Sequence, residues 1–329
     1  MAKKLLCLVL ALLMTAFACL SLSSCQKESD DGKIKIVCTI FPKYDWMRNI
    51  IGESENVELT LLIGNGNDIH GYEPSAADIM KIAESDMIVY LGENIDGWVS
   101  EAIERSGRED IKKIALAECE GVELKNISSA SHSHDEHDHS DDHDHDHGAL
   151  DEHLWLSLKN ASVLTSTLCE AICELDAANA QRYRDNAAKY TAELAELRLE
   201  FDAAVAKASE RFVLFCDRFP FVYLLEEIGV DYSAAFEGCS ADVDADFGTV
   251  MRLIEEAEEH NVRYVALTES SDGALARTVA DSVKGREVGL LTFNSMQAVS
   301  KKQIDAGACY LSIMRENLRV LSIALGSEE

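Results

Sequence analysis

The sequence predicts an α/β fold with two lobes, each a four-stranded, mainly parallel sheet flanked by helices. Three observations predict it. Eight short, apolar, β-rich runs alternate with helical stretches, the runs form two groups of four, and a long stretch without Gly or Pro separates the groups. Strands that alternate with helices form parallel sheets covered on both faces. A chain of 329 residues is long enough for two domains of ordinary size.

Each group of strands accounts for one sheet. The first group lies at residues 34–40, 57–63, 86–91 and 111–116, and the second at 211–216, 230–236, 262–268 and 286–292. The separating stretch, 178–208, is dense in Ala, Leu, Glu, Arg and Lys at helical spacing, which indicates one helix of roughly 45 Å. We therefore expect a first lobe at 33–177, a linking helix at 178–208 and a second lobe at 209–329. A continuous helix would make the lobes a stiff clamp.

The first residues predict export. Lys3 and Lys4 precede an apolar run that ends in small residues, so residues 1–24 read as a signal peptide. The run leads into Cys25 in a motif similar to a bacterial lipobox, and a polar tether follows at 25–32. We expect lipidation of Cys25 and anchoring to the outer face of the bacterial cytoplasmic membrane. An ordinary secretory signal with an incidental cysteine, giving a periplasmic protein, is the alternative.

The net charge and the cysteine content limit the partners and the redox environment that we expect for the protein. The formal net charge of −29 repels nucleic acid and anionic lipid, so we expect no nucleic-acid partner. Seven cysteines remain after the signal and Cys25, an odd number that suggests unpaired thiols, metal ligands or a reducing habitat. Cys169 and Cys173 share a helical face and could bind metal, although their Leu, Ile and Ala neighbours favour packing.

Residues 131–149 form a loop with seven histidines, seven acidic residues and no large apolar side chain. Such a segment cannot contribute to a core, and its composition is typical of a surface loop that attracts metal ions. We expect weak, multivalent capture. The histidines are His132, His134, His137, His139, His143, His145 and His147.

A tight site needs ligands from rigid positions, which in open α/β sheets lie beyond the carboxyl ends of the strands. Ligand-type side chains occur there in both predicted lobes. His70 follows the second strand, and His153 follows the histidine-rich loop just before a helix. The strands of the second lobe are followed in turn by Cys216 with Asp217, by Cys239, by Glu269 and by Asn294.

These motifs resemble those of the zinc- and manganese-binding solute-binding proteins of ABC transporters, the ZnuA-like family. Residues 70–75 (HGYEPS) are similar to its first ligand motif, H-x-Y-E-P-S, and residues 151–160 (DEHLWLSLKN) to its second, D-P-H-x-W-L-D-P-x-N. Residues 175–190 resemble the start of its backbone helix and 310–321 its last helix. The resemblance covers nearly all of the mature chain and implies two α/β lobes with a metal between them.

The resemblance carries His70 and His153 over as the first two metal ligands. The family's third ligand is a His or a Glu, and Cys216 occupies that position here. A thiolate is a good zinc ligand, but a buried inert cysteine is also common. Asp217 or Cys239 is the alternative. Glu269 has a weaker claim, because the family carries a Glu there without a clear role as a direct ligand.

Sulfur and imidazole favour zinc, whereas carboxylate favours manganese. Manganese-type relatives have an Asp where Asn294 stands, so we expect Zn(II) as the transported ion, with Mn(II) possible. The predicted function is that of a monomeric extracytoplasmic lipoprotein delivering zinc to an ABC permease and its ATPase. The alternatives are a manganese- or iron-binding member of the family, or a surface adhesin or metal buffer. No H-E-x-x-H motif occurs, and we expect no enzyme activity.

Overall fold

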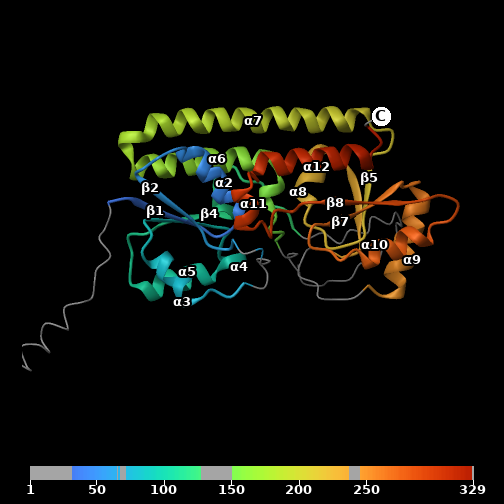
Figure 1. Cartoon of the computed structure of the whole chain (residues 1–329), viewed down its shortest axis with the longest axis horizontal. Coiled ribbons are helices and arrows are strands. Elements are labelled where there is room, and N and C mark those ends of the chain that lie inside the picture. The colour runs from blue at the N-terminus through green and yellow to red at the C-terminus, as the bar shows by residue number, and fades with distance from the viewer. Residues whose placement is uncertain (1–31, 65, 67–71, 127–149, 237–244, 328–329) are drawn as a thin grey trace, which may run out of the picture. The chain divides into compact units, whose positions relative to one another are not determined.

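The computed structural model describes residues 32–64, 66, 72–126, 150–236 and 245–327. The elements in these ranges belong to one compact unit, Ile34–Glu329, shown in Figure 1. None of the helices in these ranges combines the length and the hydrophobicity of a membrane span. The predicted signal peptide, Cys25 and the histidine-rich loop lie outside the described residues.

The first sheet has the strand order β2-β1-β3-β4, and every neighbouring pair is parallel. All four residues of the central strand β3 are buried, which explains their unbroken apolar run. The elements are β1 (Ile34–Cys38), α2 (Phe41–Ile51), β2 (Val57–Leu61), α3 (Ala76–Ala83), β3 (Met87–Tyr90), α4 (Glu93–Asp96), α5 (Trp98–Ser106), β4 (Lys112–Ala115) and the 3₁₀ turn η3 (Leu116–Glu118).

The second sheet repeats this topology in the order β6-β5-β7-β8, again with parallel pairs. In each sheet the order reverses beside the first strand, and in such sheets the crevice for a ligand opens beyond the carboxyl ends at that point. The elements are β5 (Phe212–Phe215), α8 (Val222–Ile228), β6 (Asp231–Ala234), α9 (Phe247–Glu259), β7 (Tyr264–Thr268), α10 (Ala274–Ser282), β8 (Gly289–Phe293), α11 (Lys301–Asp305) and α12 (Tyr310–Ala324).

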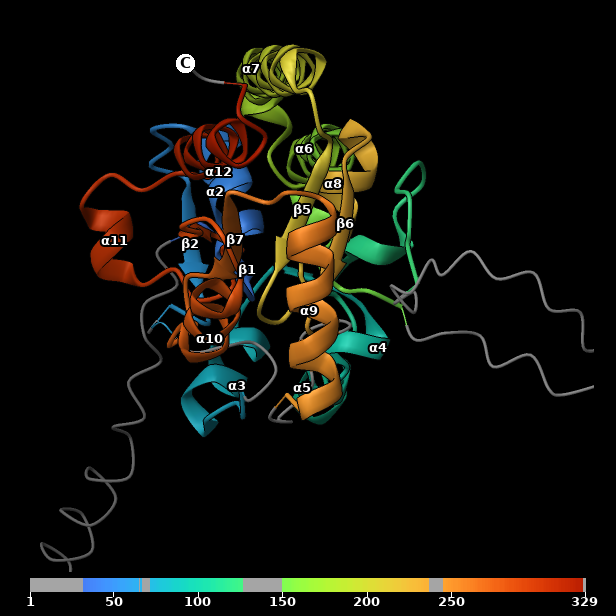
Figure 2. The ribbon, with the colours of Figure 1, turned by 90° about the vertical axis from the view of Figure 1, so that its right-hand side faces the viewer.

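Helices connect the two sheets. The linking elements are η4 (Leu154–Leu156), α6 (Leu158–Leu175), η5 (Ala177–Asn179) and α7 (Ala180–Lys207). The 28 residues of α7 make a helix of about 42 Å, and Figures 1 and 2 show α6 and α12 between α7 and the sheets. The predicted fold class and long helix are confirmed, whereas the domain boundaries at 33–177, 178–208 and 209–329 stay a prediction.

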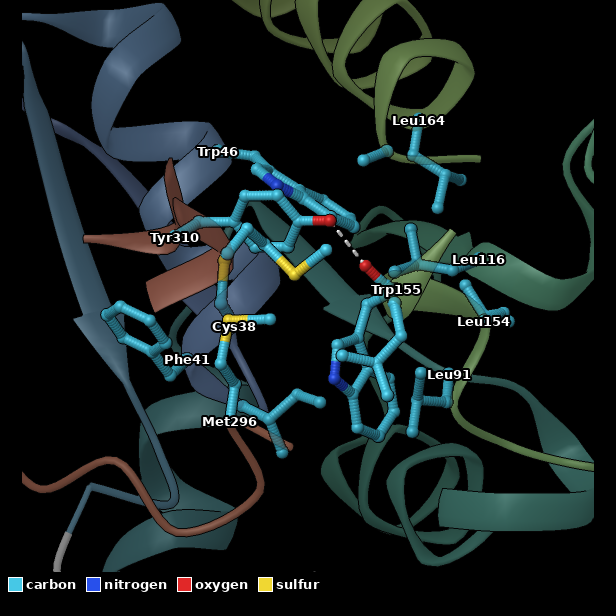
Figure 3. Close-up of a cluster of buried hydrophobic side chains, with 14 of the residues drawn as sticks. Cys38, Phe41, Trp46, Leu91, Leu116, Leu154, Trp155, Leu164, Met296 and Tyr310 are labelled. Carbon is cyan, nitrogen blue, oxygen red and sulfur yellow. Dashed lines mark hydrogen bonds between the residues drawn. The ribbon is translucent and has the colours of Figure 1, made fainter. Parts of the chain in front are cut away.

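One apolar core runs through both sheets, and Trp155 lies in it (Figure 3). The indole Nε1 of Trp155 donates to the backbone oxygen of Ser295 at 2.8 Å, and the Tyr310 hydroxyl donates to the backbone oxygen of Trp155 at 2.6 Å. Tyr310 in turn packs edge-on against Trp46, with ring centroids 5.4 Å apart. Residues from the first lobe, the linking segment and the second lobe therefore share one packed interior.

A buried charge lies near the carboxyl end of β1. The Lys43 side chain is fully buried, and its Nζ lies 3.7 Å from Oδ2 of Asp96. That carboxylate also accepts hydrogen bonds from the Thr39 hydroxyl and from the backbone of Leu91 and Gly92. Burial lowers the pKa of Lys43 to about 8, although the Asp96 charge opposes the shift.

Replacing Lys43 with Met should stabilise the protein at pH 7 by about 1–3 kcal/mol, because the lowered pKa means that the folded chain disfavours the ammonium even beside Asp96, whose carboxylate keeps its other donors. Between about 8 and the ordinary lysine value of 10.5, the unfolded chain binds the extra proton, so the stability of the parent rises with pH there. The advantage of the variant should therefore shrink between pH 7 and pH 9, as measured by urea unfolding. A stability advantage that does not change with pH would contradict the lowered pKa of Lys43.

Two tryptophans allow a matched test of the hydrogen bond to Ser295. Both indoles are fully buried, but within the described ranges Trp46 Nε1 has no hydrogen-bond partner, whereas Trp155 has one. Trp155→Phe should lower the free energy of unfolding by about 1–2 kcal/mol more than Trp46→Phe, because it also leaves the Ser295 carbonyl unsatisfied. Equal losses in chemical denaturation would show that packing alone accounts for the effect.

Candidate metal centre

His153 lies on the segment that enters α6, and its side chain is fully buried. The Asp151 carboxylate accepts from the backbone nitrogen of His153 at 2.9 Å and from the ring Nδ1 at 3.0 Å. An ionised carboxylate only accepts hydrogen bonds, so Nδ1 carries the proton and Nε2 presents a lone pair. Metal-binding histidines are commonly oriented by a carboxylate in this way.

The Nε2 atom of His153 faces the loop that follows β8. The Gln297 side-chain amide contacts it directly, donating the hydrogen bond that the lone pair accepts. Glu152 Oε1 lies 3.8 Å from the same nitrogen. Gln297 was not among the candidates from sequence. Its amide gives no signal without the fold, because Gln is common on protein surfaces.

The β8–α11 loop is held in a fixed shape. Met296 has a positive φ of 64°, which is rare for a side chain of its size. The Asn294 side chain accepts from the Met296 backbone nitrogen at 2.8 Å. The Asn317 side chain accepts from the backbone nitrogen of Asn294 at 2.8 Å and donates to its backbone oxygen at 2.9 Å. These contacts fix the direction in which the Gln297 side chain points from the loop.

Two carboxylates lie behind this loop. Glu269 accepts from the backbone and the hydroxyl of Ser295, each at 2.8 Å. Asp217 accepts from the backbone and the hydroxyl of Thr268 at 2.9 and 2.5 Å. Burial raises the pKa of Glu269, the bonds from Ser295 oppose this, and the nearby Asp217 charge adds to it. A cation at the carboxyl ends of β5, β7 and β8 would reduce the repulsion between the Asp217 and Glu269 carboxylates.

The side chain of Cys216, the residue directly after β5, packs on the face of the sheet opposite to that of Phe215. Successive strand residues point to opposite faces, and Phe215 packs in the core that runs through both sheets. Cys216 packs instead with Leu214, Leu253 and Val265 in a second apolar cluster, and only 1% of it is exposed. Burial raises the pKa of its thiol to about 12. In this arrangement the thiol is a core group, and ligation by Cys216 stays a prediction.

The candidates therefore divide into three sets. His153 and Glu269 are linked through Gln297 and Ser295 of the loop after β8, and Asp217 and Glu269 follow the carboxyl ends of β5 and β7. Cys216 does not share their face. His70, Cys239 and the seven loop histidines lie outside the described residues. Within the described ranges, no three His, Cys, Asp or Glu ligand atoms that include His153 lie within 4.8 Å of one another.

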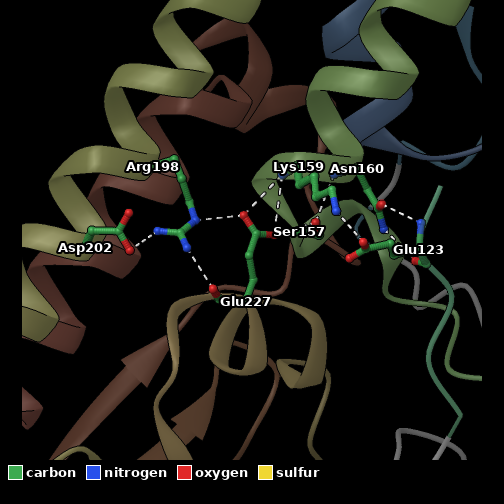
Figure 4. A network of polar contacts seen from close by, with 7 residues as sticks. All are labelled: Glu123, Ser157, Lys159, Asn160, Arg198, Asp202 and Glu227. Atoms are coloured by element: carbon green, nitrogen blue, oxygen red, sulfur yellow. Dashed lines mark hydrogen bonds and ion pairs between the residues drawn. The ribbon is translucent and has the colours of Figure 1, made fainter. Parts of the chain in front are cut away.

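Helix α8 of the second lobe fastens the His153 segment. The Tyr223 hydroxyl donates to the backbone oxygen of Asp151 at 2.8 Å. The Glu227 carboxylate accepts from the Ser157 hydroxyl at 2.5 Å, from the Lys159 backbone at 3.3 Å and from Arg198 of α7 at 3.0 Å (Figure 4). A carboxylate at the N-terminus of α6 also interacts favourably with the helix dipole.

Comparison with known proteins gives the same fold and a family. Residues 36–324 match the profile of the family described as ZnuA, zinc-uptake complex component A periplasmic. The high-affinity zinc uptake system protein ZnuA of Bacillus subtilis is 30% identical over 298 residues, which are 91% of this chain and 89% of that protein. The zinc-binding protein AdcA of Streptococcus pyogenes serotype M18 is 26% identical over 98% of this chain, which spans 61% of AdcA.

A solved structure agrees in fold. The Zn(II)-bound AdcA from Streptococcus pneumoniae superposes with a TM-score of 0.69 at 26% identity, covering 91% of this chain and 59% of that one. This chain therefore spans less than two thirds of the length of the AdcA proteins that it matches.

Removing the Glu227 carboxylate tests the attachment of α8 to the His153 segment. Glu227→Ala should lower the free energy of unfolding by about 2–3 kcal/mol, because it leaves Arg198 and the α6 N-terminus without their partly buried acceptor. Glu226→Ala is the matched control on the same helix. Its side chain is 42% exposed, so the loss should stay below about 1 kcal/mol. Equal losses in urea unfolding would contradict a role for Glu227 beyond surface charge.

Proposed function

The chain belongs to the ZnuA family, and on this premise we propose that it binds Zn(II) outside the cytoplasmic membrane and delivers it to an ABC importer. The relatives named above are a zinc-binding protein and a zinc uptake system protein, which supports zinc as the cargo. The solved relative binds Zn(II). The partners would be the permease and its ATPase, and the protein would act as a monomer.

The observation that carries the proposal is the oriented imidazole of His153. Its Nδ1 donates to Asp151, so the Nε2 lone pair is fixed toward the second lobe, where Gln297 now meets it. Binding of an ion would displace the Gln297 amide or rotate it so that its oxygen faces the metal. A buried, neutral, pre-aimed imidazole suits zinc, which binds His nitrogen at about 2.0–2.1 Å.

The rest of the ligand set is also a proposal. His70 is the second ligand from the first lobe, on the strength of its motif. Asp217, Cys239 and Cys216 are the candidates from the second lobe, with Glu269 behind them. Of these, Asp217 has the better support from geometry, because it lies at the carboxyl end of β5 beside Thr268, whereas Cys216 must leave an apolar cluster.

In the proposed cycle, the histidine-rich loop raises the local concentration of metal and the fixed ligands bind it. The lipid anchor at Cys25 would hold the protein at the outer face of the membrane, near the permease. Catalysis has no part in this cycle, and the absence of enzyme activity stays a prediction. Binding requires deprotonated ligands, so the ion displaces protons where it binds.

Two alternative functions predict different experimental results. A manganese- or iron-binding member would retain those ions in preference to zinc after purification. A surface adhesin or metal buffer would bind zinc without feeding a transporter, so deleting its gene would leave growth in zinc-poor medium unchanged. Loss of an importer component should instead cause zinc starvation that added zinc relieves.

The zinc site is tested with the mature chain and with a form that lacks residues 131–149. Both forms carry Cys169→Ser and Cys173→Ser, because that pair of thiols could itself bind metal, and both should retain one tightly held zinc, measured by elemental analysis and chelator competition. His153→Ala should abolish it. His260→Ala is the matched control, because His260 pairs with exposed Glu210 at 3.1 Å and stacks on Phe212 away from the proposed ligands.

Asp151→Asn tests the orientation of the ring. The amide no longer accepts a charge-assisted bond from Nδ1, and loss of such a supporting contact typically weakens binding about 10–100-fold. Tight zinc in His153→Ala would refute the site, and unchanged affinity in Asp151→Asn would refute the orienting role. Asp217→Asn and Cys216→Ala, measured in the same way, identify the ligand from the second lobe.

A further inference from the structure

Two cysteines on α6 lie beside each other at the contact with α7. Cys169 and Cys173 are four residues apart, which places them on one face of the helix. Both are buried, with 3% and 5% exposed, and both are free thiols. Figures 1 and 2 show α6 and α7 running side by side here. The exposed side chain of Glu170 lies at the edge of the same contact.

The three side chains meet in space. The sulfurs of the two cysteines and one carboxylate oxygen of Glu170 all lie within 4.8 Å of one another. Among the described residues, this is the only group of three possible His, Cys, Asp or Glu ligands that lie so close together. We propose that Cys169, Cys173 and Glu170 form a second metal site, which takes one thiophilic divalent cation such as zinc or cadmium. The two thiolates and the carboxylate are ligands, and water fills the fourth position.

The distances suit a tetrahedral ion. With metal–sulfur bonds of about 2.3 Å, two sulfurs on such an ion lie about 3.8 Å apart. Ligand atoms within 4.8 Å of one another reach that spacing by small side-chain rotations, without movement of the helix. Thiolates with a carboxylate favour zinc and cadmium over magnesium, calcium or manganese, because sulfur is a soft ligand.

The charges also suit a divalent ion. Arg184 of α7 holds Glu170 through two bonds, from Nε at 2.9 Å and from a terminal nitrogen at 2.7 Å, and its charge also acts on both sulfurs. Two thiolates, one carboxylate, one guanidinium and a divalent cation together are neutral. Without the ion, burial and the neighbouring Cys173 raise the pKa of Cys169 to about 12, so its thiol stays protonated. Metal binding releases the thiol protons to solvent.

This site is separate from the one at His153. Cys169 lies 11 residues beyond Leu158, the first residue of α6, which is roughly 16 Å along the axis of that helix, and His153 precedes the helix. None of the three residues contributes to the transport site. The site lies at the contact of α6 with the long helix and would join it to α7 through Arg184. It would also bind soft ions away from the carboxyl ends of the sheets.

Cadmium is the probe, because thiolate coordination gives an ultraviolet charge-transfer band that imidazole and carboxylate do not. The reduced mature chain carrying His153→Ala should take up cadmium with this band. The added exchange Cys169→Ser with Cys173→Ser should abolish it. Cys309→Ser, at the N-cap of α12, and Cys119→Ser, directly after η3, change half-buried cysteines elsewhere; they are the controls and should keep it. Circular dichroism checks that each variant is folded.

Glu170→Gln covers the case in which the double variant fails to fold, because its side chain is 60% exposed and its loss should leave the fold intact. It should keep the sulfur band and weaken cadmium binding at least about tenfold, or roughly 1.4 kcal/mol. The proposal is overturned if the band survives loss of both cysteines, if Cys119→Ser or Cys309→Ser removes it, or if Glu170→Gln binds cadmium as tightly as its parent.

Discussion

The hydrogen bonds around Trp155 are the constraint on which the rest of the site depends. Trp155 comes two residues after His153, its indole donates to Ser295, and its backbone accepts from Tyr310. Ser295 in turn binds Glu269 and precedes Gln297 by two residues. The imidazole and the loop that meets it are thus positioned by one buried contact. Shifting Trp155 would move both, since close-packed interiors leave no room for a compensating adjustment.

This contact also limits how far the two lobes can separate. The core that contains Trp155 is continuous through both sheets, and α7 packs along α2, α6 and α12. Wide separation of the lobes would expose that core at about 25 cal/mol for each Å² of apolar surface, in addition to breaking buried hydrogen bonds. Local movement of the strand-end loops exposes far less.

The fold could be predicted from sequence because its determinants are local. The runs at residues 34–40 and 262–268 alternate with helical stretches, and the Gly- and Pro-free segment at 178–208 has strong helix formers at helical spacing, which fold as α7. His153 could be proposed as a site residue because it stands in a motif with Asp151, and Asp151 is the residue that orients it. In both cases the informative residues are neighbours in the chain.

The face of Cys216 and the role of Gln297 depend on contacts between distant segments, so sequence could not provide them. Cys216 is the residue directly after β5, and a shift of one position there turns a side chain from one face of the sheet to the other. Gln297 meets His153 only because Asn317, Asn294 and Glu269 fix its loop. A neutral amide at this position adds no charge to a site that already has Asp217 and Glu269 nearby. The second lobe thus places two carboxylates after its strands and a neutral amide on the loop, so the loop adds nothing to the repulsion between the carboxylates.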